Sequence, residues 1–283
     1  MTATVYDPRT CSLGEGPLWH PERSQLFWFD INNKRLLSRV DDREMVWQFD
    51  RHVSAAGWID HDTLLIASEV ELFEFNVETG TSKPRCPLEP ENPLTRSNDG
   101  RADPWGGFWI GTMGKQAQPK AGAIYRWYNG ELRTLFDGLT IPNAICFSPD
   151  REFAYFADTP TRQIMRQPLG TDGWPNGKPS LHVDLVTQGR NPDGAVVDAD
   201  GNLWNAQWGA SRITCYDTRG RELMHVDMPA EQVSCPAFGG TDCTTLFATT
   251  AAEGMHAPSD TQGQTFFTKL DQKGQPEHRV ILT

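Results

Sequence analysis

Six pairs of short apolar segments recur along the 283-residue chain, and their nearly constant spacing limits the fold more than any other feature. Each pair consists of a short run, a turn rich in Gly, Pro and Asp, and a second, strand-like run. When the pairs are aligned on their turns, the position five residues before each turn recurs at intervals of 41, 42, 45, 50 and 42 residues. The six aligned positions are Glu15, Ala56, Asn98, Asn143, Asp193 and Cys235. A period of about 40 to 50 residues with several strands per unit is typical of a β-propeller.

The second run of each pair is rich in Phe, Trp, Ile and Val, which favours β-strands. No segment keeps a 3.6-residue apolar period, so little helix is expected. We therefore predict an all-β chain, folded as a single six-bladed β-propeller domain over residues 1–283. Residues 1–13 and 264–283 are left over, and their pairing could close one blade. A large two-sheet sandwich is the competing fold, but it gives no fixed period. The predicted strand-like runs cover residues 24–31, 62–69, 106–113, 152–159, 201–208 and 244–251.

Charge and composition exclude several classes of partner. The chain carries 26 basic and 37 acidic residues, and a net charge of -11 disfavours binding to nucleic acid backbones. No run of about 18 apolar residues exists, so no membrane-spanning helix is expected, and the N-terminus lacks the basic and apolar regions of a signal peptide. The six cysteines form no C-x-x-C pair. Reduced, buried thiols and a cytoplasmic location are therefore expected.

The aligned positions indicate a site on the propeller axis. The innermost strand of each blade lines the central channel, so residues near its start should meet at one mouth. Four of the six aligned residues bear carboxylate or amide oxygens: Glu15, Asn98, Asn143 and Asp193. Two carboxylates in a confined space repel each other, and a hard cation such as Ca²⁺, Mg²⁺ or Mn²⁺ would compensate them. The alternative is a solvated polar channel without a metal.

Four motifs occur in an order that resembles the senescence marker protein (regucalcin)/gluconolactonase family. They are L-G-E-G-P-L-W (13–19), T-R-S-N-D-G (95–100), I-P-N-A-I-C-F-S-P-D (141–150) and N-P-D-G-A-V-V-D-A-D-G-N-L-W (191–204). The resemblance implies a six-bladed propeller that binds one divalent metal ion and hydrolyses sugar lactones. The family's metal is described variously as calcium, zinc, manganese or iron, so the resemblance leaves its identity open.

The resemblance also assigns roles to individual residues. It implies that Glu15, Asn143 and Asp193 hold the metal and that Arg96 and Asn98 contact the substrate. Some relatives bring an acidic residue to the substrate from just before a G-A-x-Y motif. The corresponding stretch here is QAQPKAGAIY (116–125), which contains Lys120 and no acidic residue. Substrate preference therefore does not transfer from those relatives.

The implied reaction converts an aldonolactone, such as a glucono-, xylono-, arabinono- or galactonolactone, into the free aldonic acid. The metal would polarise the carbonyl as a Lewis acid, and Asp193 or a metal-bound water would act in the attack. A paraoxonase-like esterase and a non-catalytic metal-binding propeller are the alternatives. The oligomeric state stays open, and a small-molecule lactone is the expected partner, with neither nucleic acid nor membrane.

Other polar and aromatic residues near predicted strand ends have competing structural roles. Asp30 and Asp158 end strands near the predicted mouth, where capping a turn is more common than binding a metal. Most of four tryptophans should belong to the blade cores, and one of them could wall the pocket and stack on a sugar ring. These four are Trp19, Trp105, Trp109 and Trp208.

Overall fold

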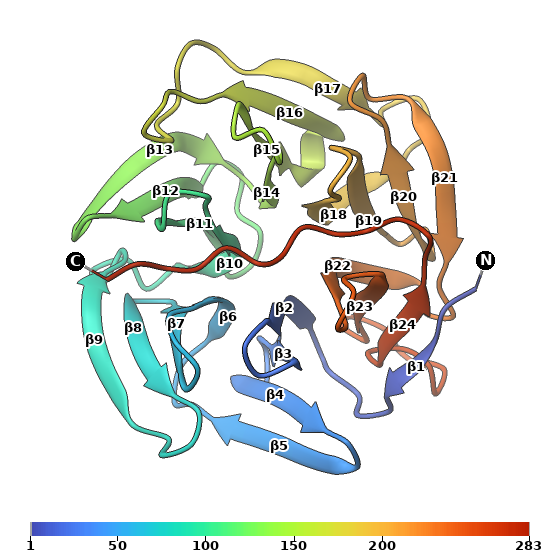
Figure 1. Cartoon of the computed structure of the whole chain (residues 1–283), viewed down its shortest axis with the longest axis horizontal. Coiled ribbons are helices and arrows are strands. Elements are labelled where there is room, and N and C mark those ends of the chain that lie inside the picture. Colours follow the sequence, from blue (N-terminus) through green and yellow to red (C-terminus); the bar gives the residue numbers. More distant parts are fainter. Residues whose placement is uncertain (1, 283) are drawn as a thin grey trace.

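The computed structural model describes residues 2–282, which form β-strands arranged as a ring around a central axis (Figure 1). The single helical element among them is a short 3₁₀ helix, η1 (Thr159–Thr161). All six predicted strand-like runs are strands, so the prediction of an all-β, propeller-like chain with little helix is confirmed. In the described part of the chain, no helix combines the length and apolar character needed to cross a membrane.

Four separate sheets contain four antiparallel strands each, in sequence order from the axis outward (Figure 1). The first consists of β2 (Gly14–His20), β3 (Gln25–Asp30), β4 (Arg35–Val40) and β5 (Arg43–Gln48). The second consists of β6 (Val53–Trp58), β7 (Thr63–Ser68), β8 (Glu71–Asn76) and β9 (Ser82–Pro87). The third consists of β10 (Thr95–Ala102), β11 (Phe108–Gly114), β12 (Gly122–Tyr128) and β13 (Glu131–Leu139). The fourth consists of β14 (Pro142–Phe147), β15 (Phe153–Asp158), β16 (Gln163–Pro168) and β17 (Ser180–Asp184).

The remaining eight strands share one hydrogen-bonded sheet. They are β18 (Asn191–Val197), β19 (Leu203–Trp208), β20 (Arg212–Tyr216), β21 (Glu222–Asp227), β22 (Gln232–Gly239), β23 (Thr245–Ala251), β24 (Thr265–Lys269) and β1 (Thr4–Asp7). The N-terminal strand β1 pairs with β24. The expectation of six separate blades is thus corrected to four four-stranded blades and one eight-stranded sheet. The cause is a pairing of Trp208 in β19 with Gln232 in β22, which joins the last two repeat units.

The innermost strands close into a ring. Each of β2, β6, β10, β14 and β18 contacts the next one, and β22 contacts both β18 and β2. Apolar side chains fill the wedges between neighbouring sheets: Phe29 and Ile66 belong to the cluster between the first two sheets, and Trp109 and Phe156 to the cluster between the third and fourth. Because these wedges bury the sheet faces, the starts of the inner strands are left to line the axis.

Each inner strand contains a one-residue β-bulge near its start. In four of them the register shifts next to a polar residue that the sequence singles out, namely Glu15 in β2, Asn98 in β10, Asn143 in β14 and Asp193 in β18. A bulge adds an unpaired residue, bends the strand and re-aims the side chains beside it. The bulges therefore turn these four side chains away from the regular alternation of the strands.

The sequence alignment is wrong by two residues in β6 and by one in β22. There the bulges lie between Val53 and Ala55, and between Val233 and Cys235, so Ser54 and Ser234 occupy the matching positions. Both serines are fully buried, whereas Ala56 packs in the apolar cluster between the first two sheets. The displacement arises because an alignment on turns does not detect where a bulge inserts its extra residue.

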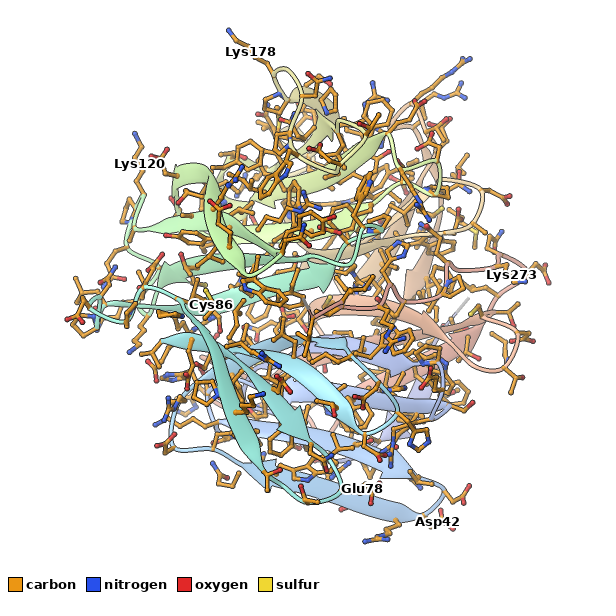
Figure 2. The ribbon with its side chains drawn as sticks, turned by 60° about the vertical axis from the view of Figure 1, so that its left-hand side comes forward. Asp42, Glu78, Cys86, Lys120, Lys178 and Lys273 are labelled. Carbon is orange, nitrogen blue, oxygen red and sulfur yellow. The ribbon has the colours of Figure 1, made fainter. Side chains whose placement is uncertain are left out.

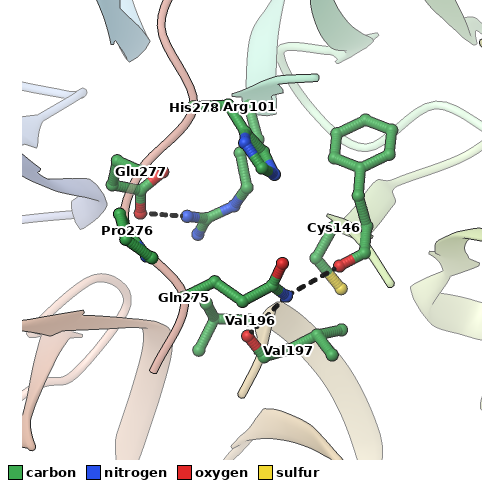
Figure 3. Close-up of a pocket in the computed structure, with 9 residues that line it drawn as sticks. Arg101, Cys146, Val196, Val197, Gln275, Pro276, Glu277 and His278 are labelled. Carbon is green, nitrogen blue, oxygen red and sulfur yellow. Dashed lines mark hydrogen bonds and ion pairs between the residues drawn. The ribbon is translucent and has the colours of Figure 1, made fainter. Parts of the chain in front are cut away.

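A C-terminal strap, residues 273–282, crosses the ring at the mouth opposite the starts of the inner strands (Figure 1). Gln275 Nε2 donates to the carbonyls of Phe147 and Val197, at the ends of β14 and β18, with distances of 3.1 and 3.0 Å. Farther along the strap, the Val280 amide donates to the Trp58 carbonyl at the end of β6. Glu277 forms a buried ion pair with Arg101 of β10 (Figure 3). The strap thus ties four inner strands together at this mouth.

Candidate active site

A cavity of about 350 Å³ opens at the mouth formed by the starts of the inner strands. All five predicted site residues line it: Glu15, Arg96, Asn98, Asn143 and Asp193. They come from β2, β10, β14 and β18, so residues up to 178 positions apart in sequence (15 to 193) meet in one pocket. Each of these five side chains is buried, with an exposed fraction of 7% or less.

Left-handed backbone at two bulges sets the direction of Glu15 and Asn143. Gly16 has φ of +52°, and a Cβ there would lie 2.2 Å from the carbonyl oxygen of Ser54, so only glycine fits this position. Ala144, which follows Asn143, has φ of 58°. A residue with a side chain adopts this conformation at a cost of about 1 to 3 kcal/mol, and such strain is concentrated at functional sites.

A chain of hydrogen bonds joins three of the site residues. Arg96 Nη1 donates to Asn98 Oδ1 at 2.8 Å, and Asn98 Nδ2 donates to Asn143 Oδ1 at 3.0 Å. Asn98 Nδ2 also donates to the Pro142 carbonyl at 3.0 Å. Arg96 and Asn98 are therefore held in fixed positions next to Asn143 before any ligand arrives.

Glu15 and Asp193, two of the three acidic residues that line the pocket, are both disfavoured as anions. Burial, followed by the nearby Asp99 carboxylate, raises the pKa of Glu15, and the Gly16 amide and Arg96 only partly offset this. Burial and then Glu15 raise the pKa of Asp193 well above its ordinary range. Neither Glu15 nor Asp193 forms an ion pair with any residue among positions 2–282. The positive charge of Arg96 therefore offsets only part of the cost of ionising both carboxyl groups.

Asp99 supports the site from outside the cavity. Its Oδ2 accepts a hydrogen bond from the Ile145 amide at 2.7 Å, so it fixes the bulge that carries Asn143. Burial raises the pKa of Asp99 to about 6, against the opposing effects of this amide and of Arg101. The Asp99 carboxylate also adds to the negative charge near the axis and raises the pKa of both Glu15 and Asp193.

The donor set fits a hard divalent cation. Glu15, Asp193 and Asn143 offer carboxylate and amide oxygens, which suit Ca²⁺, Mg²⁺ or Mn²⁺, and two positive charges would offset the repulsion between the carboxylates. Within residues 2–282, no group of three or more His, Cys, Asp or Glu side chains is placed to hold a metal ion. A site here would therefore depend on the Asn143 amide as a third protein ligand.

Of the other residues that the sequence analysis considered, Trp208 lines the cavity and the rest lie outside it. Trp109 is fully buried between the third and fourth sheets. Asp158 Oδ1 accepts hydrogen bonds from the amides of Thr140 and Ile141, a turn-capping role. Lys120 is exposed and projects from the edge of the molecule, away from the cavity lining (Figure 2).

Asp30, Trp19 and Trp105 also have structural roles. Asp30 accepts hydrogen bonds from the Leu13 amide and from Arg35. Trp19 stacks on Phe247 in the wedge between the first and last repeat units. The indole of Trp105 donates to the Thr171 carbonyl outside the pocket. These interactions agree with the expectation that most of these side chains serve the framework.

Residues that follow the second strand of a pair also reach the cavity, and the sequence reasoning missed them. Lys115 and Gln116 follow β11, Thr159 follows β15 and Glu253 follows β23, and all four line the cavity. In an antiparallel pair the end of the second strand lies beside the start of the first. That rule, applied to each repeat, would have pointed to them.

The raised pKa values predict that the metal-free protein loses stability as the pH rises. The pKa of Glu15 lies above its usual value of 4.5, at about 8, so in that window the folded state binds more protons than the unfolded state. Stability in a chelator should therefore fall across this window. Glu15→Gln should have a melting temperature at least about 2 °C above wild type at pH 8 and near it at pH 4, because it removes the charge.

The measurement is the melting temperature of both proteins in excess chelator at several pH values. The difference between the two melting temperatures reports on Glu15, because the other titratable groups are the same in both proteins. One of these groups is His182, whose pKa is lowered to about 4 by burial. A melting temperature of Glu15→Gln that stays below wild type at pH 8 would contradict the charge repulsion inferred for this pocket.

Comparisons with known proteins agree with this geometry. A family model described as "SMP-30/Gluconolactonase/LRE-like region" matches residues 13–252. A putative sugar lactone lactonase of Rhizobium meliloti is 40% identical over 94% of this chain and 92% of its own length. A pentonolactonase of Haloferax volcanii is 32% identical over 99% of this chain and 98% of its own. A crystal structure of a calcium-binding protein, regucalcin, from Agrobacterium tumefaciens superposes with a TM-score of 0.95, with 37% identity over 100% of this chain and 98% of that one.

Proposed function

The chain belongs to the SMP-30/gluconolactonase/LRE-like family, and on that basis we propose that it hydrolyses a sugar lactone to the free aldonic acid in a metal-dependent reaction. The observation that carries the proposal is the pair of buried carboxyl groups, Glu15 and Asp193, which form no ion pair with any described residue and lie in one cavity with the Arg96–Asn98 pair. The names of the sugar lactone lactonase and pentonolactonase relatives support the substrate class.

The cavity residues suit a small polyhydroxylated ring. Arg96 brings guanidinium donors, and Lys115 and Gln116 bring further polar groups at the rim. Trp208 and Ile141 offer apolar surface, on which the C–H face of a sugar can pack. A cavity of about 350 Å³ is large enough for one aldonolactone, and fixed polar groups reduce the entropy lost when the substrate binds.

We assign Glu15, Asn143 and Asp193 as the ligands of one divalent ion. Calcium, zinc, manganese and iron all remain candidates, and the description of the Agrobacterium structure as calcium-binding supports a divalent ion of some kind. When bound, the ion would act as a Lewis acid on the lactone carbonyl. It would also keep both carboxylates ionised, because opposite charge nearby lowers a carboxyl pKa.

Asp193 is the proposed general base. It accepts a proton from the attacking water while the water oxygen bonds to the carbonyl carbon. The ring C–O bond then breaks, the proton passes to the departing ring oxygen, and the products are a hydroxyl group and a carboxylic acid. Arg96, already bonded to Asn98, would donate to a substrate oxygen and hold the ring in the geometry for attack.

The proposed catalytic unit is one six-bladed domain spanning residues 1–283. A single residue pair, Trp208 with Gln232, connects β18–β21 to β22–β24 with β1, and each of these two groups has four strands. Counted this way, each of the six inner strands belongs to its own blade. A cytoplasmic location, where the six free thiols would stay reduced, is part of the same proposal.

Lactone turnover should depend on one divalent metal. Purified protein stripped with a chelator is expected to lose activity on pentono- and hexonolactones, and one added ion should restore it, because stripping removes the Lewis acid and the partner of the two carboxylates. Acid release from a panel of gluconо-, xylono-, arabinono- and galactonolactones, assayed with Ca²⁺, Zn²⁺, Mn²⁺ and Fe²⁺ separately, measures both metal and substrate preference.

Two outcomes would redirect the proposal. Metal binding without turnover of any lactone would favour the non-catalytic metal-binding propeller. Turnover of simple aryl esters but of no sugar lactone would favour a paraoxonase-like esterase. Lys120→Ala is a matched control that should retain wild-type turnover, because Lys120 lies at the exposed edge and outside the cavity lining (Figure 2).

A further inference from the structure

Thr159, the first residue of η1, lies between two of the proposed metal ligands. Asn143 Nδ2 donates to Thr159 Oγ1 at 2.9 Å, and Thr159 Oγ1 donates to the Pro192 carbonyl at 2.7 Å. Pro192 directly precedes Asp193 in β18. A single hydroxyl group therefore links the side chain of Asn143 to the backbone that carries Asp193.

The direction of these hydrogen bonds is fixed at both ends. Arg96 can only donate, so Asn98 must present Oδ1 to it and Nδ2 to Asn143. At the other end the Pro192 carbonyl can only accept, so the one hydroxyl proton of Thr159 is committed to it. Thr159 Oγ1 is then left as an acceptor, and Asn143 must turn its amide nitrogen toward it.

This constraint bears on metal binding because an asparagine binds a cation through its oxygen only. An amide rotated by 180° would present its NH₂ group to the ion instead. Asn143 Oδ1 has two lone pairs, so it can accept from Asn98 Nδ2 and still bind a cation. The hydrogen bond to Thr159 acts together with the one from Asn98 to keep the oxygen on the side of Asn98 and away from η1.

We propose that Thr159 is a positioning residue that fixes the amide orientation of Asn143 and couples it to Asp193, so that both ligands are ordered before the metal binds. The inference rests on the proposed metal site. Thr159 itself is held in place, since its amide donates to the Ile141 carbonyl at 3.0 Å and the following Pro160 restricts its backbone. Hydrogen-bond partners of metal ligands typically change metal affinity about 10- to 100-fold when they are removed.

Thr159→Val tests the inference, because valine keeps the branched shape of threonine and replaces the hydroxyl by a methyl group that can neither donate nor accept a hydrogen bond. We expect the dissociation constant for the metal to rise about 10- to 100-fold. Thr159→Ser keeps the hydroxyl and should remain within about threefold of wild type by the same argument. Titration of the chelator-stripped full-length protein with Ca²⁺, Mn²⁺, Zn²⁺ and, under anaerobic conditions, Fe²⁺, each separately and by calorimetry or dye competition, gives the affinities without any activity assay.

A purely structural role would lower the melting temperature of the stripped Thr159→Val protein and leave its metal affinity unchanged. That result would overturn the inference and leave the proposed function standing. If the wild-type protein binds none of the four ions, the proposed metal site fails and the role of Thr159 fails with it. Thr159→Ala provides the same comparison with Thr159→Ser should the valine variant not fold.

Discussion

Asp193→Asn is expected to lower kcat/KM for the preferred lactone by roughly 10²- to 10⁴-fold, the usual contribution of a general base. Asparagine has the shape of aspartate but cannot take a proton from water. The substitution also removes one of two negative charges from the proposed metal site, so metal affinity should fall as well. Glu15→Gln should weaken metal binding similarly, and its effect on turnover should be reduced at high metal concentration, because Glu15 has no proton-transfer role in the proposal.

Asp193→Asn should also be more stable than the wild-type protein in the absence of metal. Burial and Glu15 raise the pKa of Asp193, so an ionised Asp193 destabilises the folded, metal-free protein near neutral pH. Loss of activity together with a higher melting temperature in chelator would separate a functional role from misfolding. Full turnover by both Asp193→Asn and Glu15→Gln would contradict the site assignment.

Asp198→Asn is a matched control on the same repeat unit. Asp198 directly follows β18, at the strand end opposite Asp193, and its carboxylate accepts from the amides of Asp200 and Asn202 and from the indole of Trp204. Its substitution should lower the melting temperature and leave metal affinity unchanged. The two variants are thus expected to have opposite effects on stability and function.

The repeat and its turns were sufficient to predict the first two strands of each repeat unit and four residues of the cavity, Glu15, Asn98, Asn143 and Asp193. Arg96 was predicted only from the family resemblance. The period located every inner strand because a turn between two strands needs Gly, Pro or Asp wherever it occurs. The alignment failed at Ala56 because the composition of a strand does not show where a bulge inserts its extra residue. In β6 the residue at the bulge is Ser54. Bulge position depends on packing between neighbouring inner strands, as in the hydrogen bond from Ser54 Oγ to the Asn98 carbonyl.

The other side of the cavity was predictable in principle but needed a second rule. Thr159 and Glu253 follow the second strands of their units, and the antiparallel pairing places them at the same mouth as the strand starts. The contacts of the strap were beyond prediction. Arg101 and Glu277 are 176 residues apart, and neither belongs to a periodic pattern that would place them together.

Breaking the ion pair between Arg101 and Glu277 is expected to destabilise the protein by about 3 to 5 kcal/mol. Only 9% of the Arg101 side chain and 6% of the Glu277 side chain are exposed, so removing either partner leaves the other charge buried without compensation. Arg101→Met and Glu277→Met test this by denaturant unfolding. The ion pair (Figure 3) also anchors the strap to β10, at a position three residues beyond Asn98. Both variants should therefore unfold at lower denaturant concentration.

The double variant Arg101→Met/Glu277→Met decides whether charge or packing causes the loss. Two apolar side chains of similar volume leave no buried charge unpaired, so the double variant should recover much of the stability lost by either single variant. Glu131→Gln, which removes an exposed partner of Arg133, is the surface control and should leave the unfolding midpoint unchanged. Additive losses in the double variant would show that the strap is held by packing and backbone hydrogen bonds such as Val280 to Trp58, with no net coupling between the two charges.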